Sequence, residues 1–212
     1  MLPIILKLKL ATAAAAGFAS AAAVPVPAPA LAMVVAERAA APVEVKLHDE
    51  NLGVSATVGI RRDGAMDPAT AATVKHLLRC RQTGREHPIS GRTLAMLADL
   101  AEKYAPRTIE FVSAYRVQPG ESPTSPHRDA RAIDFRIRGL PLTPIRDYLW
   151  RTYTEVGIGW YPSEQFIHMD SRPGLHDTAW TFLGGENHYH PYWAEVARRP
   201  AAEPVQRHRP GV

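Results

Sequence analysis

Two histidines and two aspartates are spaced so that they could bind a metal ion. His127 and Asp134 stand in the segment SPHRDARAIDF, and His168 and Asp170 stand in QFIHMD. Successive side chains of a β-strand point to opposite faces, so Asp134 faces away from the apolar residues beside it, and His168 shares a face with Asp170. If the two strands are neighbours, His127, Asp134 and His168 are predicted to converge.

This trio has the composition of a catalytic metal site. Two imidazoles and one carboxylate, with a fourth position open to water, are a ligand set of catalytic zinc. Zinc lowers the pKa of a bound water towards neutrality and polarises a carbonyl oxygen. A cation also offsets the cost of burying Asp134 among apolar residues. From spacing alone a second interpretation stays open, in which Asp134 faces solvent or forms an ordinary ion pair with Arg131 or Arg136.

The elements that must position these residues are predicted from apolar periodicity. Alternation indicates strands, and apolar residues three and four positions apart indicate helices. The sequence predicts two strands within 44–60, helices from Asp67-Pro68 and from Ser90 to Tyr104, strands at 108–115 and 132–137, a helix capped by Thr143-Pro144, a hairpin of EVGIGWYP and QFIHMDS, and a last strand in HDTAWTF. This order predicts an α+β fold with a central, largely antiparallel sheet and helices packed on one face.

The two ends of the chain differ from this central part. Residues 1–32 combine two lysines, a short apolar segment and an Ala-Leu-Ala site, the pattern of a cleaved signal peptide. Prolines interrupt the apolar segment, which disfavours the alternative of an uncleaved membrane anchor. We therefore expect a periplasmic or secreted protein without stable membrane insertion. It would have a flexible leader at 33–43, one domain at 44–183 and a loosely held tail at 184–212.

Composition limits the class of partner. Removing residues 1–32 takes away two of the 25 basic residues and none of the 21 acidic ones, so the remaining chain has 23 against 21. This near balance does not favour nucleic acid as a partner. Cys80 is the only cysteine, so an internal disulfide is excluded. No phosphate loop, dinucleotide fingerprint or nucleophile elbow is present, and the pattern does not indicate an oligomeric state.

Three motifs occur in a specific order along the chain. Ser113 to Arg116 reads SAYR, Ser125 begins a Ser-x-His-x6-Asp segment that contains His127 and Asp134, and His168 follows. With these motifs the chain resembles the zinc peptidases that include D-Ala-D-Ala carboxypeptidases, dipeptidases and murein endopeptidases, and that share a fold with the hedgehog signalling domain. It is most similar to an exported bacterial murein peptidase branch, and the resemblance spans about residues 45–182.

The resemblance implies roles for individual residues. His127, Asp134 and His168 would hold Zn²⁺, and peptidoglycan peptide stems or cross-links would be the substrate. Arg116 would bind the substrate carboxylate or stabilise the oxyanion, tasks that suit a guanidinium group. Ser125 would donate a hydrogen bond to substrate or to a ligand, or would only shape a Ser-Pro turn.

Two positions depart from the family pattern. Many relatives have a glycine where this chain has Ala130, and dipeptidase-type members have a glutamate, their general base, where this chain has Gln165. Glu164 is one position away and would face the opposite side of a strand. Asp170 shares the face of His168, with α-carbons roughly 6.5–7 Å apart. Asp170 is the preferred functional carboxylate, either as a base acting through the metal-bound water or as a partner that orients His168.

The leading hypothesis is thus a zinc metallopeptidase that cleaves peptidoglycan peptides by metal-activated water. Two alternatives stay open. One is a D-Ala carboxypeptidase of the same family, in which Arg116 binds the terminal carboxylate. The other is a non-catalytic, zinc-stabilised module that binds the cell wall, which the glutamine at position 165 motivates.

Overall fold

The computed structural model of the protein describes residues 41–199. The expected signal peptide at 1–32, residues 33–40 of the expected leader, and residues 200–212 lie outside this part. No helix among residues 41–199 is both long and apolar enough to cross a membrane.

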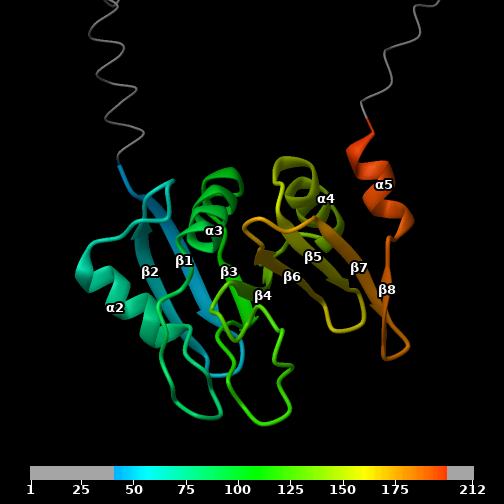
Figure 1. Ribbon diagram of the computed structural model, residues 1–212. Coiled ribbons are helices and arrows are strands. Elements are labelled where there is room, and N and C mark those ends of the chain that lie inside the picture. The colour runs from blue at the N-terminus through cyan, green and yellow to red at the C-terminus, as the bar shows by residue number, and fades with distance from the viewer. Residues whose placement is uncertain (1–40, 200–212) are drawn as a thin grey trace, which may run out of the picture. The chain divides into compact units, whose positions relative to one another are not determined.

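A single mixed sheet of eight strands forms the centre of the described part (Figure 1). Its strands are β1 (Val43–Asp49), β2 (Val54–Ile60), β3 (Ile109–Ser113), β4 (Ala132–Ile137), β5 (Val156–Tyr161), β6 (Phe166–Ser171), β7 (Thr178–Leu183) and β8 (Glu186–Tyr189). They lie in the order β2-β1-β3-β4-β6-β5-β7-β8. Only the β1–β3 and β5–β7 pairs of this sheet are parallel. The predicted α+β fold with a largely antiparallel sheet is therefore confirmed.

Four helices accompany the sheet in residues 41–199. They are α2 (Pro68–Leu77), α3 (Gly91–Lys103), α4 (Leu142–Thr152) and α5 (Tyr192–Arg198). Helix α3 packs on β1, β2 and β6, while α4 packs on β5, β6 and α5. The hydroxyls of Tyr148 and Tyr153 both donate to Asp99 Oδ2, at 2.6 and 2.5 Å, and so join α4 to α3.

The sequence predicts the capping residue of α2 correctly but not that of α4. Asp67 caps α2 as predicted, because its Oδ1 accepts from the backbone N–H groups of Ala69 and Thr70 at 2.9 and 3.0 Å. The predicted cap at Thr143-Pro144 is wrong. Helix α4 already begins at Leu142, with Pro141 at the cap position and no side-chain capping bond.

The expectation of a loosely held tail from Gly184 is wrong for residues 186–198. Strand β8 pairs antiparallel with β7, and α5 packs on α4, where the Trp150 indole donates to the Ala194 carbonyl at 2.8 Å. The Arg146 guanidinium lies 4.5 Å from the Trp160 ring and 4.3 Å from the Trp193 ring. The histidine- and proline-rich composition predicted weak packing, but these cation–π contacts with buried Arg146 hold the segment.

Replacing Trp193 by alanine should therefore loosen α5 without disturbing the centre of the sheet. We expect the free energy of unfolding to fall by about 2–3 kcal/mol, less than for a fully buried tryptophan because this ring is half-buried. Chemical denaturation gives the value, and hydrogen exchange should accelerate in β8 and α5. Tyr192→Ala is the matched control, since Tyr192 is 71% exposed. Equal losses in the two variants would contradict the packing role.

The two faces of the central strands have different partners. Ile133 and Phe135 of β4, with Ile167 and Met169 of β6, are buried in the hydrophobic core. The alternating positions, which include Asp134, face the other side of the sheet. The predicted division of the strand faces is confirmed, and it leaves polar residues of two adjacent strands on one surface.

Candidate metal centre

The three side chains that the sequence predicts to converge do lie together. Asp134 of β4 and His168 of β6 are directly paired across neighbouring strands, and His127 comes from the turn that precedes β4. His168 Nδ1 lies 2.8 Å from Asp134 Oδ1 and 3.1 Å from His127 Nε2, and His127 Nε2 lies 3.3 Å from Asp134 Oδ1. All three residues are at least 95% buried.

The outer nitrogen of each imidazole has its own hydrogen-bond acceptor. His127 Nδ1 lies 2.5 Å from the Ala114 carbonyl oxygen, and His168 Nε2 lies 2.9 Å from Asp170 Oδ2. A carbonyl and a carboxylate accept hydrogen bonds, so each of these nitrogens carries a proton. In the neutral rings His127 Nε2 and His168 Nδ1 then present lone pairs towards each other and towards Asp134.

Three facing electron-pair donors repel one another unless a cation lies among them. The donor set therefore fits a metal ion, and the outer acceptors fix the imidazole orientation as partners of metal-bound histidines do. Burial lowers the pKa of His168, but hydrogen bonds to Asp134 and Asp170 outweigh it and raise that pKa to about 9. A proton can thus occupy the same position on Nδ1, and a metal ion has to displace it.

Both carboxylates at the centre stay ionised at neutral pH. Burial raises the pKa of Asp134, but the charge of and hydrogen bonds from His127 and His168 outweigh it and hold that pKa well below its usual range. Burial likewise raises the pKa of Asp170, yet hydrogen bonds from His168 and Arg172 bring it down to about 2. Each imidazole of the trio thus has an ionised carboxylate close by, which would stabilise a cation there, although each carboxylate also pairs with an arginine.

Arg116 is the arginine that contacts Asp134. It follows β3, and its Nη1 lies 3.2 Å from Asp134 Oδ2. Its Nε lies 2.9 Å from Glu121 Oε2, so Glu121 holds the guanidinium from the opposite side. The predicted interpretation of Asp134 as an ion-pair partner of Arg131 or Arg136 is wrong, because both arginines pair with other acids. Arg131 pairs with Asp129, and Arg136 pairs with Glu50 and Glu110.

The turn that carries His127 is shaped by its own residues. Ser125 Oγ accepts from the backbone N–H of His127 at 3.3 Å and lines the same cavity as the two histidines. Ala130, where many relatives have glycine, is fully buried with a φ of 51°. This left-handed conformation suits glycine, which has no Cβ. The turn therefore keeps its geometry at some cost in backbone strain.

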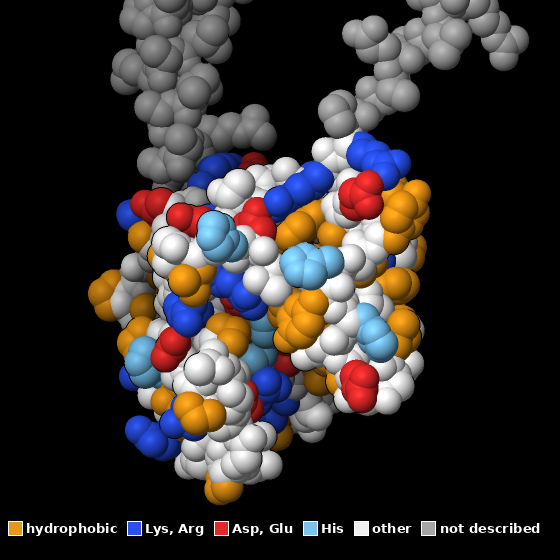
Figure 2. Space-filling view, turned by 45° about the vertical axis from the view of Figure 1, so that its right-hand side comes forward, with side chains coloured by type: hydrophobic (Ala, Val, Ile, Leu, Met, Phe, Trp, Pro, Cys, Tyr) orange, Lys and Arg blue, Asp and Glu red, His pale blue; other side chains and the backbone are white. Residues whose placement is uncertain are grey.

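A cavity of about 450 Å³ opens above the two imidazoles. His127 and His168 line it together with Arg116 and Arg172, and Tyr161, Trp180 and Tyr189 form an aromatic side. Figure 2 shows a hollow in one face of the molecule with histidine surface inside it and hydrophobic and basic side chains at its border. Both imidazoles therefore reach this cleft.

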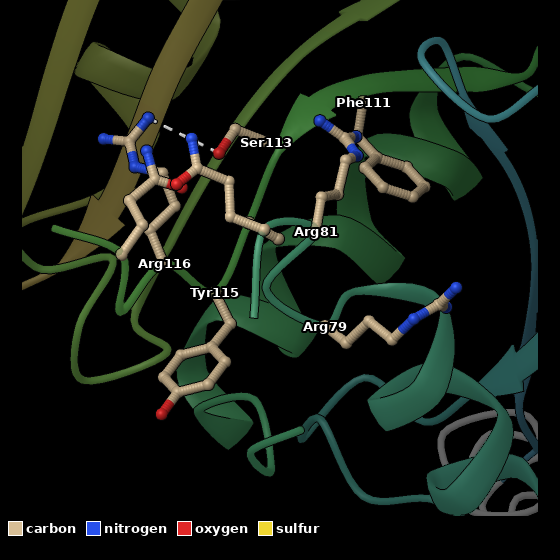
Figure 3. A pocket seen from close by; sticks show the side chains of 9 residues that line it. Arg79, Arg81, Phe111, Ser113, Tyr115 and Arg116 are labelled. Carbon is tan, nitrogen blue, oxygen red and sulfur yellow. Dashed lines mark hydrogen bonds between the residues drawn. The ribbon is translucent and has the colours of Figure 1, made fainter. Parts of the chain in front are cut away.

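A second cavity of about 290 Å³ lies on the other side of Arg116 (Figure 3). Arg79, Arg81, Phe111 and Tyr115 line it, and neither imidazole does. Both Asp49 carboxylate oxygens accept from the Arg81 guanidinium, which lies 5.7 Å from the Phe111 ring. Arg116 is thus the wall between this basic cavity and the cleft that holds the histidines.

Asp170 lies behind His168 and is completely buried. Its Oδ2 contacts His168 Nε2, which is the ring nitrogen remote from Asp134. Arg172 donates from Nε to Oδ1 at 2.7 Å and from Nη2 to Oδ2 at 2.9 Å. The other two positions considered for a base, Glu164 and Gln165, are exposed in the β5–β6 turn, where the Gln165 amide donates to the Pro162 carbonyl.

Sequence reasoning missed Arg172 and Glu121. Arg172 continues the alternation that begins with His168 and Asp170, so its position two residues later was a usable signal for a third residue on the same face. Glu121 stands in a loop without periodicity, and nothing in its local sequence indicates that it reaches Arg116.

Comparison with known proteins places the chain in a family. The family model described as peptidoglycan L,D-endopeptidase MepK matches residues 37–176, more than half of the chain. The probable peptidoglycan L,D-endopeptidase MepK of Haemophilus influenzae (strain ATCC 51907 / DSM 11121 / KW20 / Rd) is 27% identical over 118 residues, covering 50% of this chain and 63% of that protein. The peptidoglycan L,D-endopeptidase MepK of Escherichia coli (strain K12) is 29% identical over 80 residues, 33% of this chain and 43% of that protein.

The chain thus spans less than two thirds of the length of these curated relatives. No solved structure matches it. The family match nevertheless contains every residue of the convergent trio, together with Arg116, Ser125 and Asp170. The chain belongs to the peptidase family described as peptidoglycan L,D-endopeptidase MepK.

Proposed function

We propose that this protein is an exported, zinc-dependent murein endopeptidase that hydrolyses amide bonds in peptidoglycan peptide stems or cross-links. The observation that carries the proposal is the meeting of two imidazole nitrogens and one carboxylate oxygen within 3.3 Å of one another. Family membership and the printed activity of the relatives support the substrate class. A hedgehog-like arrangement of the fold is part of the same proposal.

The proposed ligands are His127 through Nε2, His168 through Nδ1 and Asp134 through its carboxylate. Two imidazoles and one carboxylate suit zinc with one position left for water or substrate. When bound, zinc would lower the pKa of that water and polarise the substrate carbonyl. The buried surroundings of the trio exclude bulk water, which strengthens every charge interaction there.

The chain's own residues then have separate tasks. Arg116 lines the cleft beside Asp134, and its guanidinium would bind a substrate carboxylate or the oxygen on which negative charge develops. Ser125 holds the turn of His127 and presents its hydroxyl to the cleft for a substrate hydrogen bond. Asp170 holds the His168 ring through Nε2, and this contact supports an orienting role over that of a general base.

Asp170→Asn should weaken metal binding by about 10–100-fold, as removal of a partner that orients a ligand does. The amide can no longer accept as strongly from His168 Nε2, so the ring loses its fixed orientation. Competition with a chelator measures the metal affinity, and saturating zinc should restore part of the activity. Unchanged metal affinity together with abolished activity at saturating zinc would instead assign Asp170 the role of base.

Mass spectrometry of digested sacculi tests the function itself. Residues 33–212 with zinc should convert cross-linked dimers to monomers. Release of free D-alanine without split dimers would favour a carboxypeptidase. Retained metal with no product from any muropeptide would favour a zinc-stabilised binding module.

The proposal also includes export. The pattern of residues 1–32 supports a cleaved signal peptide, a leader at 33–43 and a periplasmic or secreted domain from residue 44. N-terminal sequencing of the protein recovered from its producing cells tests this part. A chain that still begins at Met1 would contradict it.

A further inference from the structure

Strand β5 has glycine at two positions, 157 and 159, that share the face of the sheet with His168 and Asp170. Gly157 pairs with Asp170, and Gly159 pairs with His168. A Cβ added at Gly157 would lie 2.1 Å from Asp170 Oδ2 and 2.4 Å from Arg172 Nη2, and one at Gly159 would lie 2.5 Å from the Trp180 indole. The two glycines thus let Arg172 and Trp180 lie directly on the sheet beside His168.

The guanidinium of Arg172 is fixed in place, but only two of its three nitrogens donate hydrogen bonds within residues 41–199. Nε and Nη2 donate to Asp170, and the Trp180 ring centre lies 5.8 Å away. Nη1 donates to none of the residues at 41–199, and the side chain is 21% exposed. Arg172 lines the cleft together with His127 and His168. An arginine already held in one conformation loses little entropy when it binds a carboxylate.

Arg116 and Arg172 lie on opposite sides of the histidine pair. Arg116 contacts Asp134 on β4, at the β3 side of the site. Arg172 lies over Gly157 on β5, at the other side. Because β4 and β6 lie between β3 and β5 in the sheet, a peptide bound across the imidazoles would meet a guanidinium at each end of the cleft.

We propose that Arg172 is a specificity-determining residue that binds a free carboxylate of the peptide substrate close to the cleaved bond. This inference rests on the proposed function and adds a second anionic subsite to it, opposite Arg116. Its consequence is a preference for peptides with that carboxylate over otherwise identical peptides in which it is amidated. A charge-assisted hydrogen bond to a fixed guanidinium accounts for such a preference.

The test compares a set of stem-peptide substrates in which each carboxylate in turn is replaced by a carboxamide. For one position, the wild-type protein with zinc should show kcat/KM about 10–100-fold higher for the acid than for the amide. Arg172→Gln should reduce this ratio to near 1, chiefly through loss of rate on the acid. Arg172→Lys, which keeps the charge, should give an intermediate ratio.

Arg61→Gln is the matched control, because Arg61 is 48% exposed, pairs with Asp63 and does not line the cleft. It should leave both the rate and the acid-to-amide ratio unchanged. A wild-type ratio near 1 at every position, or an unchanged ratio in Arg172→Gln, overturns the proposal while endopeptidase activity stands.

Calorimetric binding of the same peptide pairs tests the subsite independently of turnover. If no peptide is cleaved, the proposed function fails, but the acid should still bind about 10–100-fold more tightly than the amide, and Arg172→Gln should abolish the difference. Equal binding of the acid and amide forms by the wild-type protein overturns the subsite. Thermal unfolding of each variant shows whether it is folded.

Discussion

His127→Ala should yield a folded protein that has lost both its bound zinc and its hydrolytic activity. The substitution removes the Nε2 lone pair that faces His168 Nδ1 at 3.1 Å and Asp134 Oδ1 at 3.3 Å. Two ligands cannot hold zinc as three do, so metal affinity should fall by more than the roughly 10–100-fold that loss of an orienting partner costs. Elemental analysis of the purified variant and muropeptide digestion measure the two effects.

His76→Ala is the control for this variant, because the His76 side chain is 66% exposed, pairs with Glu86 and does not line the cleft. It should keep about one zinc per chain and full activity. Circular dichroism should show the secondary structure of both variants unchanged. Full muropeptide cleavage by His127→Ala would exclude the proposed mechanism.

Gly157→Ala should inactivate the protein although residue 157 touches no substrate in the proposed scheme. The new Cβ would stand 2.1 Å from Asp170 Oδ2 and 2.4 and 2.6 Å from two guanidinium nitrogens of Arg172. The ion pair must move, and His168 then loses the acceptor that fixes its ring. We expect a fall in zinc affinity of about 10–100-fold and a larger fall in kcat/KM, because the displaced Arg172 also leaves its subsite.

Gly91→Ala provides the comparison for that variant. A Cβ at Gly91, the first residue of α3, would have no atom within 4 Å outside its chain neighbours and helix backbone. It should leave zinc affinity and activity unchanged. Wild-type metal affinity in Gly157→Ala would show that the position of the Asp170–Arg172 pair does not control the metal centre.

Periodicity allowed the strands of the site to be predicted because it records which face of an element is buried. The alternation in AIDFRI placed Asp134 opposite the core, and the same rule placed His168 and Asp170 on one face. What alternation does not record is which strands are neighbours. Asp134 meets His168 because β6 lies next to β4. The sequence did not predict this pairing, and the convergence of the trio was therefore conditional on it.

Polar partners that come from distant segments were not predictable from local sequence. Arg131 and Arg136 were candidates for Asp134 because they are near it in the chain, yet the actual partner, Arg116, arrives through the pairing of β3 with β4. The His127 ring is fixed by the carbonyl of Ala114. Every residue has a backbone carbonyl, so the residue type at position 114 does not indicate this contact. The tail prediction failed for a related reason, since composition does not report that Trp193 meets Arg146.

The β7–β8 hairpin lies beyond residue 176, where the family match ends, yet it supplies Trp180, Asn187 and Tyr189 to the lining of the cleft. The proposed metal ligands lie wholly within the matched residues. The aromatic side of the cleft and the proposed ligands therefore come from different stretches of the chain, although the Trp180 ring lies 5.0 Å from the His168 ring. Exchanging this hairpin between homologues would change that aromatic side while the sequence of the proposed ligands is kept.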